Sequence, residues 1–150
     1  MVVDSLLQDI KYADLTNIKI QEAIGRFEIV SDFPVKIIDG AHNYEGVEIL
    51  LRDFENKYGN LTTDIFLGFK KGKGINKILN LFIKKTNYNL HLIEDNTFFD
   101  QEITKEIEYL LDKNGKSYKI ASFEQFKKNK NPSILLGSLY LIGEYKKRKL

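Results

Sequence analysis

A largely apolar strand passes through a tight turn into a helix in the segment Val35-Lys36-Ile37-Ile38-Asp39-Gly40-Ala41-His42-Asn43. Four consecutive residues ending at Ile38 have the composition of a buried strand. Gly40 and Ala41 carry almost no side chain, and Asn43 is suited to cap the helix that follows. This strand–turn–helix unit is typical of an α/β domain with a parallel sheet.

Outward from this unit, runs rich in Ile, Val, Leu and Phe alternate with segments of helical period. Strands are expected near 27–30, 35–39, 63–68, 88–94, 118–121 and 133–137. Amphipathic helices are expected over 47–58, 75–83 and 103–111, the first ending at Gly59 and the last at Asn114-Gly115. We therefore predict a Rossmann-like, three-layer α/β domain with a mostly parallel sheet of about six strands and helices on both faces.

Composition limits the possible functions. The 150 residues, 43% of them hydrophobic, suffice for one compact domain. The formal charge of +2 provides no large basic field for nucleic-acid binding, and no apolar run is long enough to span a membrane or form a signal peptide. The absence of cysteine excludes disulfides, Cys-based zinc sites and thiol nucleophiles, and fits a cytoplasmic protein.

The first 24 residues differ from the rest, since they contain short apolar helical pieces and no strand. We expect 1–24 to be the tail of a preceding domain with a linker, and 25–150 to be the α/β domain. On this interpretation Met1 is a truncation start; a native start is the alternative.

Polar residues gather where the strand of the opening stretch ends, and parallel sheets bind ligands beyond the carboxyl ends of their strands. Asp39 at the strand tip could accept ribose hydroxyls, while the first amides of the helix after Asn43 could face an anion. The alternative is that Asp39 and Asn43 only cap and that His42 is a surface histidine. The residues alone leave both interpretations open.

Three motifs resemble those of one family. Gly25-Arg26-Phe27-Glu28 is similar to a GRFE signature, Asp39-Gly40-Ala41-His42-Asn43 to a DGAHN signature, and the segment 135–144 to a closing strand–GS–helix segment. Their order and the Arg-to-Asp spacing resemble the carboxy-terminal domain of the folylpolyglutamate synthase/dihydrofolate synthase family, within the Mur ligase superfamily. The resemblance covers roughly residues 22–145.

Two segments depart from the family pattern. Ala23-Ile24 stands where the family usually has Trp-Pro, and Gly68-Phe69-Lys70-Lys71-Gly72-Lys73-Gly74 stands where it commonly has a DKD-like motif. Lys73 matches the central lysine, but both flanking aspartates are missing. The segment also lacks the spacing and Ser/Thr of a phosphate-binding P-loop, so we expect a flexible, solvated basic turn.

The resemblance implies an ATP-dependent, ADP-forming ligase. ATP would phosphorylate a folate carboxylate, and the amine of glutamate would attack the acyl phosphate to form an amide. The P-loop and the ligands of Mg²⁺ are expected in a central ATPase domain of the same protein, and none in this chain. The implied partners are ATP, glutamate and a folate, with no nucleic acid or membrane, in a cytoplasmic monomer.

By resemblance, Arg26 binds the nucleotide phosphates and Asp39 the ribose hydroxyls. His42 is the catalytic candidate and, with Ser138, is expected near the incoming glutamate or the transferred phosphate. Since both follow strands of one parallel sheet, they should lie close together. The alternatives are a surface histidine for His42 and a helix cap for Ser138. His91 alternates with apolar residues and is expected to be structural.

Two other function classes remain open. One is a non-catalytic nucleotide-binding module or degenerate paralogue, favoured by the missing aspartates in 68–74. The other is a Mur-type ligase acting on a cell-wall precursor. The basic end, Lys146-Lys147-Arg148-Lys149, needs no anionic partner, because the helix dipole favours cations at a helix carboxyl end.

Overall fold

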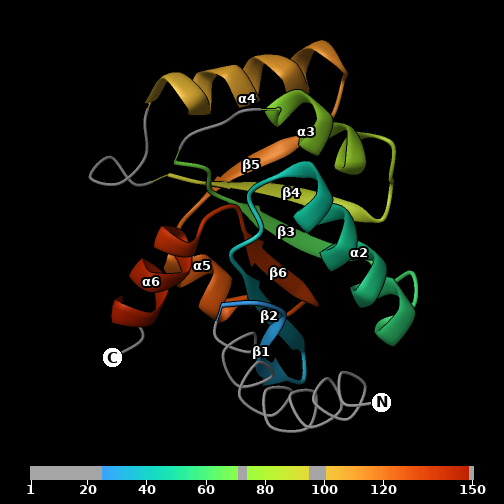
Figure 1. Ribbon diagram of the computed structural model, residues 1–150, viewed down its shortest axis with the longest axis vertical. Helices are drawn as coiled ribbons and strands as arrows, with labels where there is room; N and C mark the ends of the chain where they lie inside the picture. Colours follow the sequence, from blue (N-terminus) through green and yellow to red (C-terminus); the bar gives the residue numbers. More distant parts are fainter. Residues whose placement is uncertain (1–24, 71–73, 95–100, 149–150) are drawn as a thin grey trace, which may run out of the picture.

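A six-stranded sheet forms the centre of the molecule (Figure 1). The computed structural model describes residues 25–70, 74–94 and 101–148. The strands are β1 (Glu28–Asp32), β2 (Val35–Asp39), β3 (Thr63–Leu67), β4 (Tyr88–Ile93), β5 (Tyr118–Ala121) and β6 (Ser133–Leu136). Their spatial order is β1-β2-β6-β3-β4-β5, and all pairs are parallel except β1 with β2.

Helices cover both faces of the sheet. They are α2 (Tyr44–Tyr58), α3 (Ile75–Ile83), α4 (Gln101–Lys113), α5 (Phe123–Lys128) and α6 (Leu139–Arg148). Figure 1 shows α2, α3 and α4 over one face and α5 and α6 over the other. The three-layer α/β architecture expected from the sequence is confirmed.

The alternation of side chains along the strands explains the two layers. In β6, Ile134 and Leu136 pack with the α2–α4 side, whereas Leu135 packs with Phe126 and Leu141 of α5 and α6. Successive side chains of a strand point to opposite faces, so a strand covered on both faces must be apolar throughout. The sequence shows such apolar runs within β2, β3 and β6: Ile37-Ile38, Ile65-Phe66-Leu67 and Ile134-Leu135-Leu136.

The strand order opens a crevice at the carboxyl ends of two neighbouring strands. β6 is inserted between β2 and β3, and Asp39 at the end of β2 is paired with Leu136 at the end of β6. The helices after these two strands, α2 and α6, pack on opposite faces. Adjacent strands whose helices diverge in this way leave a ligand crevice beyond their carboxyl ends.

The expected elements match the observed ones except in details. The first strand covers Glu28–Asp32 and not 27–30, because Phe27 has a φ of 44° that no strand accepts. The short helix α5 was not expected. The helical pieces expected within 1–24 and the Lys73 position lie outside the described residues.

Candidate functional site

The crevice beyond β2 and β6 contains a pocket of about 230 Å³. Its lining comes from the loops after β2, β3 and β6 and from the start of α6: His42, Lys70, Gly137, Ser138, Leu139 and Tyr140. The juxtaposition of His42 and Ser138 expected from the sequence is therefore confirmed. Nearly one hundred residues separate them along the chain, and the parallel pairing of β2 with β6 brings their loops together.

Backbone contacts between glycines shape this pocket. A Cβ added to Gly137 would lie 2.3 Å from the carbonyl oxygen of Gly68, and the φ of Gly137 is 133°. The N–H of Gly68 donates to the carbonyl of Leu136 at 3.0 Å. Only glycine allows the loops after β3 and β6 to approach this closely.

Asp39 connects the two amino-terminal motifs. Its Oδ2 accepts the backbone N–H of Phe27 at 2.9 Å, and its Oδ1 accepts that of Ala41 at 2.7 Å. The N–H of Gly40 donates to the carbonyl of Gly25 at 2.6 Å. The GRFE and DGAHN segments are thus hydrogen-bonded to each other at the carboxyl edge of the sheet.

The environment of Asp39 opposes its ionisation. The residue is only 8% exposed, and burial raises the pKa of its carboxyl. The N–H groups of Phe27 and Ala41 and the charge of Arg26 lower the pKa but offset burial only in part. Arg26 itself is exposed, and its charge acts on this carboxylate.

His42 is exposed, and its ring has a defined hydrogen-bond direction. Nδ1 lies 3.0 Å from the carbonyl oxygen of Gly40. A carbonyl only accepts, so Nδ1 carries a proton and Nε2 is the nitrogen left for a ligand. A neutral His42 therefore presents an acceptor at Nε2, and only the protonated ring presents a donor there.

Ser138 and Asn43 both cap helices. The Oγ of Ser138 accepts the N–H of Tyr140 at 3.1 Å at the start of α6. Its hydroxyl proton remains able to donate to a ligand in the pocket. Asn43 accepts the N–H of Gly46 at 2.8 Å and is the N-cap of α2. The capping roles considered for both residues from the sequence are confirmed.

Two further pocket residues were not identified from the sequence. The Nζ of Lys70 lies 4.2 Å from the ring centroid of Tyr140, a cation–π contact within the pocket. Lys70 belongs to the loop that was expected to be only a solvated turn. More than sixty residues lie between the two side chains, so no local pattern could indicate their contact.

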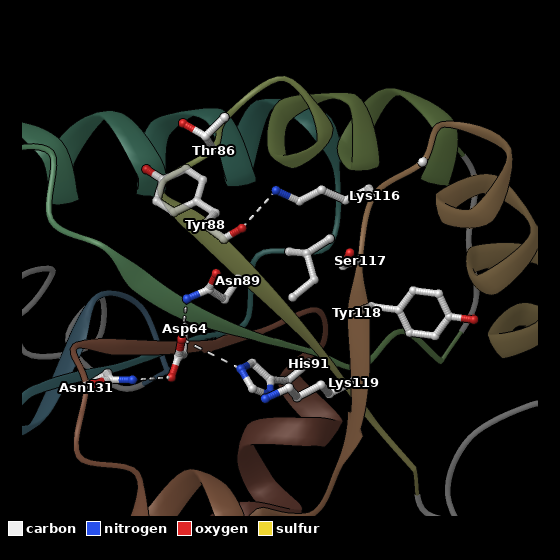
Figure 2. Close-up of a pocket in the computed structure, with 12 residues that line it drawn as sticks. Asp64, Thr86, Tyr88, Asn89, His91, Lys116, Ser117, Tyr118, Lys119 and Asn131 are labelled. Carbon is white, nitrogen blue, oxygen red and sulfur yellow. Dashed lines mark hydrogen bonds and ion pairs between the residues drawn. The ribbon is translucent and has the colours of Figure 1, made fainter.

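A larger pocket, of about 540 Å³, lies at the opposite edge of the sheet, where the parallel strands begin (Figure 2). One of its lining residues is the buried Asp64, whose carboxylate accepts the side-chain amides of Asn89, Asn129 and Asn131 at 2.9–3.1 Å. Burial would raise the pKa of Asp64, but these amides and His91 outweigh it and lower the pKa. This cluster is polar but internally satisfied, as expected of a structural network.

His91 belongs to the same network. Its ring stacks on Phe66 with centroids 4.5 Å apart, and its Nε2 lies 3.7 Å from Oδ1 of Asp64. Burial lowers the pKa of His91, against the opposing effect of Asp64. The structural role expected for His91 agrees with these contacts.

Residues 25–70, 74–94 and 101–148 contain no group of three or more His, Asp or Glu side chains that could hold a metal ion. Within the same ranges, no helix combines the length and apolar character needed to cross a membrane.

Comparisons with known proteins identify related chains. No protein-family model matches. The dihydrofolate synthase/folylpolyglutamate synthase of Bacillus subtilis (strain 168) is 30% identical over 132 residues, covering 83% of this chain and 30% of the relative. The folylpolyglutamate synthase of Thermotoga maritima superposes with a TM-score of 0.68 at 22% identity, over 83% of this chain and 30% of that one.

A third relative is the bifunctional folylpolyglutamate synthase/dihydrofolate synthase from Yersinia pestis, complexed with AMPPNP and Mn ion. It has a TM-score of 0.61 at 17% identity, over 84% of this chain and 31% of that one. The chain thus spans under a third of the length of the relatives it matches. In sequence and in fold it resembles the carboxy-terminal domain of the folylpolyglutamate synthase/dihydrofolate synthase family.

Proposed function

We propose that the chain is the carboxy-terminal domain of an ATP-dependent ligase that adds glutamate to a folate. The observation that carries this proposal is the crevice at the carboxyl edge of the sheet. His42 and Ser138, from two of the three motifs, line one pocket of about 230 Å³ there, and the third motif is hydrogen-bonded to the segment that carries His42.

The proposed reaction proceeds through an acyl phosphate. ATP phosphorylates a folate carboxylate, and the amine of glutamate then attacks the acyl carbon, releasing phosphate; the other product is ADP. Catalysis of such a transfer rests on positioning and on fixed polar groups more than on a protein nucleophile. The nucleotide analogue and Mn ion in the Yersinia pestis relative, and L-glutamate in another bifunctional relative, support this choice of substrates.

Arg26 and Asp39 form the nucleotide side of the proposed site. Arg26 is exposed, and its guanidinium suits phosphate oxygens, which it can bind through two parallel hydrogen bonds. Asp39 is expected at the ribose, although both of its carboxylate oxygens already accept backbone N–H groups.

His42 and Ser138 form the glutamate side. Because Nδ1 of His42 donates to Gly40, Nε2 is the atom that can accept a proton from the incoming amine or, when protonated, donate to an oxyanion. The hydroxyl of Ser138 can donate to a carboxylate or phosphate oxygen while its oxygen continues to cap α6. Magnesium would supply charge neutralisation on the nucleotide phosphates, held by another domain of the protein.

The proposed domain acts together with a central ATPase domain of the same polypeptide, as a monomer in the cytoplasm. The competing proposal is a nucleotide-binding module without turnover. It is favoured by the loop 68–74, in which glycines stand at both aspartate positions of the DKD-like motif.

The test is a turnover assay on the longer protein that carries this domain. ADP release is measured with ATP and glutamate and with dihydropteroate, tetrahydrofolate or a UDP-muramoyl acceptor. Release that requires glutamate and either pterin substrate is expected. Release only with the UDP-muramoyl acceptor would favour the Mur-type alternative, and nucleotide binding without release would favour the non-catalytic module.

A further inference from the structure

The segment that carries Arg26 has an unusual backbone. Its neighbour Phe27 has a φ of 44°, and within the described residues it is the non-glycine residue with a positive φ. This left-handed conformation is unfavourable for a residue with a Cβ, and it persists only where surrounding contacts impose it. Since Phe27 is next to the proposed ligand-binding arginine, another group must stabilise its positive φ.

Asp39 stabilises this conformation of Phe27. Its Oδ2 accepts the N–H of Phe27 at 2.9 Å, although twelve residues separate the two along the chain. Its Oδ1 accepts the N–H of Ala41 at 2.7 Å, so the carboxylate is itself fixed from the other side. A buried, charged acceptor makes a strong hydrogen bond to a backbone N–H.

Two more contacts fix the ends of the same segment. The carbonyl of Gly25 accepts the N–H of Gly40 at 2.6 Å, and the N–H of Gly25 donates to Oε2 of Glu28 at 3.0 Å. Glu28 also forms an ion pair of 2.8 Å with Lys146 of α6. Arg26, which is exposed, therefore projects from a backbone whose neighbours on both sides are held in place.

We propose that Asp39, in addition to its place at the ribose, is a positioning residue for Arg26 and acts through the backbone of Phe27. The inference rests on the proposed function, since it assumes that Arg26 binds the nucleotide. Each oxygen of this carboxylate, which is 8% exposed, accepts one backbone N–H group and keeps a second lone pair for another donor. A fixed backbone lowers the entropy lost when Arg26 closes on phosphate oxygens.

The first test is a double-mutant cycle in the longer protein. Asp39→Asn keeps the size of the side chain but replaces one accepting oxygen with an NH₂ group, so one backbone N–H loses its acceptor. We expect the KM for ATP to rise about tenfold, the effect of one charged hydrogen bond, with the KM for glutamate changed less than about twofold. In an Arg26→Met background, Asp39→Asn should raise the KM for ATP less than about twofold. A full tenfold rise in that background would overturn the proposal.

The second test separates positioning from ribose contact. With 2′,3′-dideoxy-ATP, which lacks both ribose hydroxyls, Asp39→Asn should still raise the KM about tenfold. If the effect of Asp39→Asn disappears with this analogue, the ribose contact accounts for the whole effect and the positioning role is wrong.

Rescue gives the third test. Glycine adopts positive φ without strain, so Phe27→Gly should reduce the effect of Asp39→Asn to about threefold or less, each variant being compared with Phe27→Gly alone. An undiminished effect would contradict the role of the strained residue.

The Phe27→Gly variant also gives a result if Asp39→Asn alone does not fold. Recovery of folding by Phe27→Gly would then support the proposal, and failure of the double variant to fold would count against it. Wild-type protein without folate- and glutamate-dependent turnover would refute the proposed function. Turnover combined with a failed cycle would refute only the positioning role.

Discussion

Replacing Gly137 with alanine tests the closest backbone contact in the proposed site. Gly137 follows β6 with a φ of 133°, and an added Cβ would lie 2.3 Å from the carbonyl oxygen and 2.7 Å from the carbonyl carbon of Gly68. Both atoms are backbone atoms of the loop after β3, so no flexible side chain can move aside.

Two costs add in the Gly137→Ala variant. A residue with a Cβ at this φ costs about 1–3 kcal/mol in backbone strain. Separating the two loops to relieve the clash costs about 1–3 kcal/mol more, as in other overpacked interiors. The free energy of unfolding should therefore fall by about 2–6 kcal/mol, a large part of the about 5–15 kcal/mol typical of a domain.

Urea unfolding followed by circular dichroism measures this change, with Gly143→Ala as the matched control. Gly143 lies within α6, its added Cβ would meet no atom within 4 Å, and its φ is not positive. Alanine there should stabilise by about 0.5–1 kcal/mol through helix propensity. A Gly137→Ala variant within about 0.5 kcal/mol of wild type would refute the account of the glycine contact.

Three further predictions concern the network at the far edge, the site and the isolated chain. Asp64→Asn replaces an accepting carboxylate oxygen with an NH₂ group that faces the amides of neighbouring asparagines, and it should lower the free energy of unfolding by about 1–3 kcal/mol at neutral pH. The pKa of Asp64 is lower in the folded state, so the extra stability of wild type over the variant is present above the unfolded pKa and should shrink as the pH falls below about 4. Urea unfolding at several pH values measures this, and a difference in unfolding free energy that stays constant with pH would contradict it. In the longer protein, His42→Ala should raise the KM for glutamate about tenfold or more, with the KM for ATP changed much less, and equal changes in both would contradict the glutamate-side assignment. The chain of 150 residues alone should fold but show no folate-dependent ADP release, because its sequence has no P-loop; release from the purified chain would disprove this.

Much of the fold could be predicted because the central strands contain short apolar runs. β2, β3 and β6 are covered on both faces, so burial selects a composition that is visible in the sequence alone. α5 was missed because it has only six residues, too few for a helical period to appear. Its boundaries depend on a capping box in which Ser122 and Gln125 bond reciprocally, a signal weaker than an apolar stripe.

The site was only partly predictable, because its decisive contacts join residues far apart in the chain. The motif segments and the parallel sheet were enough to place His42 beside Ser138. The hydrogen bond from Phe27 to Asp39 depends on the antiparallel pairing of β1 with β2, which alternation along the chain does not reveal. The contact of Lys70 with Tyr140 depends on the insertion of β6 next to β3.

Product analysis distinguishes the ligation of glutamate to a pterin from ATP hydrolysis alone. The longer protein is incubated with ATP, glutamate and either dihydropteroate or tetrahydrofolate monoglutamate, and the pterin product and ADP are quantified by mass spectrometry. We expect a pterin carrying one additional glutamate for each ADP formed, and neither product when glutamate is omitted. An unchanged pterin pool beside ADP that forms without glutamate would contradict this expectation.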